Sequence, residues 1–78
     1  MLTTENYYEE HKDLTIEELE VLQNKIENEL THVYHMMSMA TLENNKEKFQ
    51  ELNNKSIELH RKLSAVQILI NHKETGLI

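Results

Sequence analysis

Histidine is a common metal ligand, and this chain of 78 residues contains five histidines. The five copies are His11, His32, His35, His60 and His72. Residues three apart share one face of a helix, so His32 and His35 could contact the same ion. A structural zinc site needs four ligands. In the fold derived below only Glu51 lies near this pair, and His60 lies more than about 10 Å away along the helix axis. The sequence therefore predicts no metal site.

The other reactive residue types form no recognisable catalytic set. The chain has no Cys, which excludes disulfides and thiolate metal sites. Its single glycine, Gly76, cannot form a glycine-rich phosphate loop. No nucleophile can be matched with a base and a group to orient that base. We therefore predict no enzymatic activity and no cofactor.

Residues 31–40 concentrate flexible apolar side chains, with three methionines and one tyrosine. Methionine surfaces adapt to differently shaped partners. The competing interpretation is an ordinary core in which methionine fills gaps. Together with other apolar residues that lie off the predicted helix contact, they form a set of candidate partner-binding residues. That set is Leu22, Tyr34, Met36, Met39, Ile57 and Leu69.

Long helices are the elements expected to position these residues. One Gly and no Pro are too few for a fold with many turns. Thr15 with Glu18 three residues later is typical of a capping box at a helix start. Apolar residues then recur at alternating steps of three and four, which predicts a heptad seam. This first seam is Ile16, Leu19, Ile26, Leu30, Val33, Met37 and Ala40, interrupted by Gln23.

A second seam follows the same rule but is out of phase with the first. It contains Leu42, Phe49, Leu52, Leu59, Leu63, Val66 and Ile70, with Asn45 and Ser56 as polar interruptions. The phase changes at Asn44 and Asn45, a residue type that accepts turn and cap conformations. We therefore predict an all-α fold, a coiled-coil-like antiparallel hairpin of two helices. The alternative is one continuous helix with a register shift, which would require dimerisation.

The predicted organisation divides the chain into an arm and a hairpin. Residues 1–13 show no apolar period and are expected to form a flexible acidic arm, with Tyr7 and Tyr8 able to fold back. Residues 14–78 form the hairpin, with helices at about 15–41 and 45–73 and a turn at about 41–45. Because two helices bury only one seam, the apolar surplus favours homodimerisation into a four-helix bundle.

The net charge of −6 is unevenly distributed. Residues 1–31 hold nine acidic and two basic residues, a charge of −7, whereas residues 32–78 hold five acidic and six basic residues, a charge of +1. An acidic chain is poorly suited to nucleic acid or anionic membranes, so neither is an expected partner. The sequence also shows no signal peptide and no apolar run of membrane-spanning length, which favours a cytoplasmic protein.

One segment resembles part of a known family. Residues 56–64 are similar to the second-helix pattern of the sporulation-type aspartyl-phosphate phosphatases of Gram-positive bacteria. That family has Ser-Gln-Glu-Leu-Asp where this chain has residues 60–64, which keep only Leu63. The catalytic residues of the family therefore do not carry over.

The function that these features favour is a small, non-enzymatic protein–protein interaction module. It is expected to associate with itself and to bind and modulate an unidentified partner protein, as regulators and inhibitors from bacteria, phages or mobile elements do. One alternative is an acidic mimic of nucleic acid that blocks a DNA-binding protein. Another is a metal-dependent or phosphatase-like hairpin.

Overall fold

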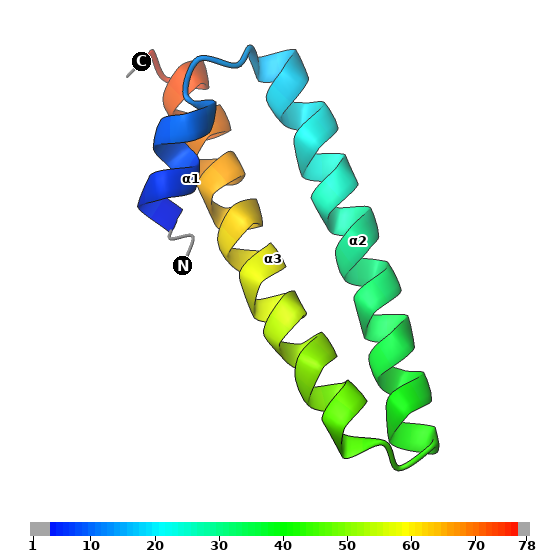
Figure 1. The fold of residues 1–78 in the computed structure, drawn as a ribbon. Coiled ribbons are helices and arrows are strands. Elements are labelled where there is room, and N and C mark those ends of the chain that lie inside the picture. The colour runs from blue at the N-terminus through cyan, green and yellow to red at the C-terminus, as the bar shows by residue number, and fades with distance from the viewer. Residues whose placement is uncertain (1–3, 77–78) are drawn as a thin grey trace.

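Three helices make up the fold of residues 4–76, which are the residues that we describe in a computed structural model of the chain. They are α1 (Thr4–His11), α2 (Ile16–Leu42) and α3 (Lys46–Glu74). The two long helices form an antiparallel hairpin, and α1 lies against the C-terminal part of α3 (Figure 1). The molecule is elongated, with principal extents of 48 × 23 × 14 Å. The predicted all-α hairpin is therefore confirmed, and a short third helix is added to it.

Helix α2 begins where the capping box predicted. Thr15 Oγ1 accepts a hydrogen bond of 3.1 Å from the Glu18 amide, and Glu18 Oε1 accepts one of 3.0 Å from the Thr15 amide. Two amides that the first helical turn leaves without a carbonyl partner are satisfied in this way. The same contacts hold the pKa of the Glu18 carboxyl below its ordinary value, because they stabilise the carboxylate.

The reversal of the chain uses the two asparagines. Asn44 has a φ of 55°, in the left-handed region that Asn tolerates better than most residues. The Asn45 amide donates to the Ala40 carbonyl (2.9 Å) and the Asn44 amide to the Thr41 carbonyl (3.1 Å), the pattern of a Schellman motif. The Asn45 side chain then accepts from the Lys48 amide and caps α3. Two separate helices result, rather than one continuous helix.

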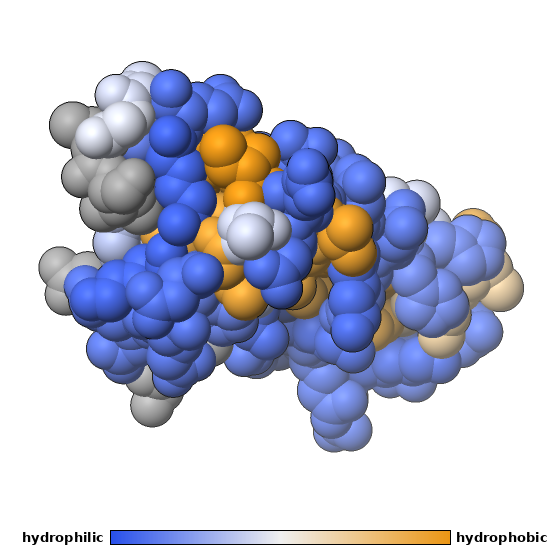
Figure 2. Space-filling model, turned by 90° about the horizontal axis from the view of Figure 1, so that it is seen from above, coloured by the Kyte–Doolittle hydropathy of each residue, from blue (hydrophilic) through white to orange (hydrophobic). Residues whose placement is uncertain are grey.

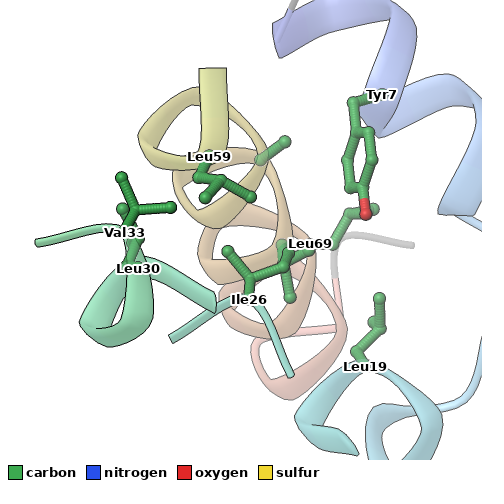
Figure 3. Packing of buried hydrophobic residues seen from close by; sticks show 9 residues of the cluster. Tyr7, Leu19, Ile26, Leu30, Val33, Leu59 and Leu69 are labelled. Carbon is green, nitrogen blue, oxygen red and sulfur yellow. The ribbon is translucent and has the colours of Figure 1, made fainter. Parts of the chain in front are cut away.

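Most of the core residues lie along the predicted seams, whereas Tyr7, Ala65 and Leu69 lie off them. Figure 3 shows side chains of α2 directed toward α3 and Tyr7 reaching the core from α1. Leu42 differs from its prediction as a seam residue, because it ends α2 and its side chain is 78% exposed. The buried apolar residues are Tyr7, Leu19, Ile26, Leu30, Val33, Ala40, Leu59, Ala65, Val66 and Leu69.

The N-terminal segment differs most from the sequence analysis, which predicted a flexible arm for residues 1–13. Residues 4–11 form α1, and the Tyr7 side chain is only 7% exposed. A tyrosine ring buries enough apolar surface to hold a helix of two turns that would not be stable alone. The folding back of Tyr7 and Tyr8, which the sequence analysis left open, is therefore what the structure shows.

None of the three helices, over the residues that the structure describes, combines the length and the hydrophobicity needed to cross a membrane.

Candidate protein-binding surface

The hairpin has two flanks, and α1 covers only one of them. Successive residues of a helix are rotated by about 100° about its axis. With the seam residues of α3 facing α2, this rotation places His60 on one side of the seam and Leu69 on the other. We call the flank that carries Leu69 and α1 the covered face. The opposite flank, which carries Tyr34 and His60, is the exposed face.

The seam residues on the covered face are almost completely buried, except for Leu52, which is half-buried. They recur every seven residues along each helix, and six of them are 4% exposed or less. The set is Leu19, Ile26, Val33 and Ala40 of α2 with Leu59 and Val66 of α3. At the free end, where α2 begins and α3 ends, α1 lies over this flank. Farther along, half-buried Met36, Lys48 and Lys62 border it, and the aliphatic parts of lysine side chains can cover apolar neighbours.

The seam residues on the exposed face are covered less well. Leu30 and Ser56 are buried there, but several large apolar side chains are not. Phe49 is 37% exposed, and the others are half-buried. The incompletely covered set is Ile16, Met37, Phe49, Leu63 and Ile70. The core of the monomer is therefore covered more completely on one flank than on the other.

The docking of α1 depends on two adjacent tyrosines. The Tyr7 ring lies in the core and stacks on His11, with ring centroids 4.0 Å apart. The Tyr8 hydroxyl and His72 Nδ1 of α3 form a hydrogen bond of 2.8 Å. Burial, with smaller contributions from the carboxylates of Glu10 and Glu29, raises the pKa of the Tyr7 hydroxyl. These contacts hold α1 against α3 at the free end.

A second tyrosine–histidine pair lies on the exposed face. The Tyr34 hydroxyl of α2 is hydrogen-bonded to His60 Nε2 of α3. Tyr34 is nevertheless 45% exposed. Because the pair joins the two helices near the middle of the hairpin, it places an aromatic ring with a polar tip at the centre of this face. Such amphipathic rings are common in protein interfaces.

The six predicted partner-binding residues are not brought together on one surface. Tyr34 lies on the exposed face, and Ile57, which is 45% exposed, lies at its edge. Leu22, Met36 and Met39 lie on the other flank of α2; the first two are half-buried and Met39 is exposed.

Leu69 requires a correction. Its side chain is 0% exposed, because it lies in the core where α1 docks on α3. It is therefore not available to a partner in this structure. Leu69, which lies off the predicted seam, is instead part of the site where α1 packs against α3.

Sequence reasoning missed Phe49 as a surface residue. It assigned Phe49 to the seam, and the heptad repeat carries no signal for how well each seam residue is covered. The side chain also borders a hollow of about 440 Å³ at the turn, together with Thr41, Asn45 and Gln50. A larger hollow of about 580 Å³ lies along α2 and is lined mainly by polar residues, including Lys25, His32 and Lys55.

Viewed from the free end of the hairpin, hydrophobic surface gathers in the middle of the molecule with hydrophilic side chains around it (Figure 2). Over residues 4–76, no three His, Asp or Glu side chains come close enough together to hold a metal ion. His32 and His35 are both exposed on α2. The arrangement thus offers apolar contact area rather than a set of converging reactive groups.

No protein-family model, curated protein or solved structure gives a significant match to this chain.

Proposed function

We propose that this protein is a small, non-enzymatic interaction module that binds another protein and modulates it. The observation that carries the proposal is the exposure of large apolar side chains on an elongated hairpin. Tyr34, Met39 and Ile57 are each at least 40% exposed. Tyr34 and Ile57 share the exposed face and Met39 lies on the other flank, so each flank offers apolar surface of the kind that commonly marks a protein interface.

Self-association into a four-helix bundle is part of the same proposal. A domain of this length buries a small core and usually needs a further source of stability. The partly open core supports this inference, because a second hairpin would cover side chains that the first leaves in contact with water. Helical surfaces of this kind suit a regulator or inhibitor that occupies a surface of its target.

The proposal can be tested by affinity capture from the native host with matched variants. Met39→Asp places a charge in the apolar surface of α2, and Val21→Asp places one at an exposed position that points away from α3. Ile57→Asp and Ile68→Asp form the equivalent pair on α3, since these isoleucines are 45% and 42% exposed.

We expect a specific protein to be captured by the wild type and by both control variants, and to be lost with Met39→Asp or Ile57→Asp. Circular dichroism of every variant checks that the hairpin remains folded. Identical captured proteins for all variants, or capture of nothing above background, would contradict the proposed function.

A further inference from the structure

We infer that the exposed face binds the exposed face of a second copy of this chain, with the two hairpins antiparallel. The turn of one copy then lies over the free end of the other. The inference rests on the proposed function and names one partner for it.

The first support is the uneven burial of the core. Six seam residues of the covered face are at most 4% exposed and a seventh, Leu52, is half-buried, whereas on the exposed face Phe49 is 37% exposed and Met37, Leu63 and Ile70 are half-buried. A layer of helices on the exposed face would remove this apolar surface from water. The contact can run along the hairpin, since the molecule is 48 Å long, and a specific interface buries about 800 Å² per partner. On the covered face, α1 already occupies the free end.

The second support is the absence of charged residues from one strip of α3. Every residue that α3 contributes to the exposed face between Phe49 and Ile70 is uncharged, and the centres of interfaces are depleted of charge. The strip consists of Phe49, Asn53, Ser56, His60, Leu63, Gln67 and Ile70. The lysines at positions 48, 55 and 62 of α3 lie on the covered face, because they are in the same seven-residue repeat as Leu69.

The distribution of charge along the hairpin selects the orientation. The free end, residues 4–29 and 58–76, holds eleven acidic and five basic residues, a charge of −6. The turn end, residues 30–57, holds three of each and is neutral. A parallel arrangement would place two free ends of charge −6 side by side, which like-charge repulsion opposes. An antiparallel arrangement places each of them over a neutral turn end.

Helix α2 shows the same preference in more detail. A second hairpin turned end over end onto the exposed face places each helix over its own counterpart. The first half of α2, with five acidic residues, then lies over residues 30–42, which contain no Asp, Glu, Lys or Arg. Those residues instead supply hydroxyl, imidazole and thioether groups. Glu17, Glu18 and Glu20 thus lie over uncharged residues, and Glu27 and Glu29, near the centre of α2, are the acidic residues that lie at a level close to their own counterparts.

Sedimentation equilibrium of purified wild-type protein and of the Ile57→Asp and Ile68→Asp variants tests the face. We expect a dimer whose dissociation constant rises at least tenfold with Ile57→Asp and less than threefold with Ile68→Asp, because Ile68 points away from the exposed face. A wild type that stays monomeric at every concentration overturns this inference, as does equal weakening by both variants. Capture of another protein is tested separately by Met39→Asp, whose substitution lies on the other flank, so failure here is distinguishable from failure of the proposed binding function.

Cross-linking of single-cysteine variants tests the orientation and does not depend on a disruptive substitution. The chain has no Cys, so each variant carries one reactive site. Asn53 and Gln67 lie seven residues on either side of His60, near the middle of α3. In the antiparallel dimer, Asn53→Cys of one copy therefore meets Gln67→Cys of the other.

A short bismaleimide should join a mixture of these two variants as a heterodimer. Ser38→Cys mixed with Gln50→Cys is the matched control, because these positions lie at the same level only when α2 of one copy runs over α3 of the other. Cross-linking of the control pair in place of the first pair would mean a parallel dimer and would overturn the inferred orientation.

Discussion

The two flanks of the hairpin are built from the same heptad pattern but differ in how completely they are buried. On the covered face, Val33 and Leu59 lie beneath other side chains and are almost inaccessible to water. On the exposed face, Leu63 and Phe49 occupy equivalent positions of the repeat but remain in contact with solvent. The comparison shows that a regular apolar repeat specifies which helices meet, whereas coverage of each flank depends on what else packs there.

Helix α1 accounts for part of the difference. It has eight residues, against 27 and 29 in the two long helices, and therefore reaches only the C-terminal part of α3. It acts as a short third helix over one end of one flank. Nothing equivalent lies on the other flank within the described residues, and that flank carries the Tyr34–His60 pair at its centre.

The largest expected difference between the flanks comes from truncating two leucines of α3. Leu59→Ala should destabilise the protein by ~2–5 kcal/mol, the range for a buried leucine, because its side chain is 4% exposed. Leu63→Ala should cost clearly less at concentrations where the protein is monomeric, because Leu63 is only half-buried. Chemical denaturation followed by circular dichroism measures both. Equal losses would show that the two flanks are not differently covered.

Removal of the Tyr7 ring should separate the behaviour of α1 from that of the hairpin. Tyr7→Ala is expected to cost ~2–3 kcal/mol of docking free energy, because a large and mainly buried side chain is lost. Hydrogen exchange should then become fast for residues 4–11 and stay slow for the middle of α2. Tyr34→Ala is the matched control on the exposed face and should leave exchange in α1 unchanged. Protection of α1 that survives Tyr7→Ala would contradict this account of its docking.

Loss of the cap on α2 should have a smaller effect that is shared by both flanks. Thr15→Ala removes the side chain that accepts from the Glu18 amide, and such substitutions cost about 1 kcal/mol. Thr31→Ala, at an exposed position inside the same helix, should change stability by less than half as much. Thermal unfolding of the two variants makes the comparison, and an equal decrease would mean that the cap contributes nothing specific.

The smallest expected effect is a change at alkaline pH confined to the covered face. The pKa of Tyr7 is raised above 10.0, chiefly by burial, so the folded protein retains this proton more strongly than the unfolded chain does. The protonated Tyr7 hydroxyl therefore contributes its full stabilisation below pH 10.0, and this contribution is lost as the pH rises through the raised pKa. The ultraviolet absorbance of tyrosinate should show that one tyrosine of the wild type ionises at a higher pH than the others. This ionisation should be absent from the Tyr7→Phe variant. A wild-type titration with no late group would contradict the burial of this ring.

Much of the fold follows from local chemistry and could be predicted. Thr15 and Glu18 predicted the start of α2, and Asn44 and Asn45 predicted the turn, because caps and left-handed residues depend on a few neighbouring residues. The seams predicted all the buried side chains of α2 and some of those of α3, but not Ala65 or Leu69. The helix α1 could not be predicted in the same way, since its stability comes from burial of Tyr7 against residues more than fifty positions away.

The candidate surface was only partly predictable for the same reason. Tyr34, Met39 and Ile57 lie off the seam and are exposed, whereas Leu69 also lies off the seam and is fully buried. Helical periodicity places all four residues off the seam but does not say which of them is covered. The position of α1 explains the burial of Leu69, because α1 covers one flank of α3 at the free end.

The sequence alone determined the helical class, the hairpin, its turn and the concentration of acidic charge toward the free end. Each of these depends on composition or on neighbours within about one heptad. The tertiary structure decided which flank is covered, that Leu69 belongs to the core and that Phe49 reaches the surface. Burial is a property of everything packed around a side chain. The repeat that brings α2 and α3 together does not contain that information.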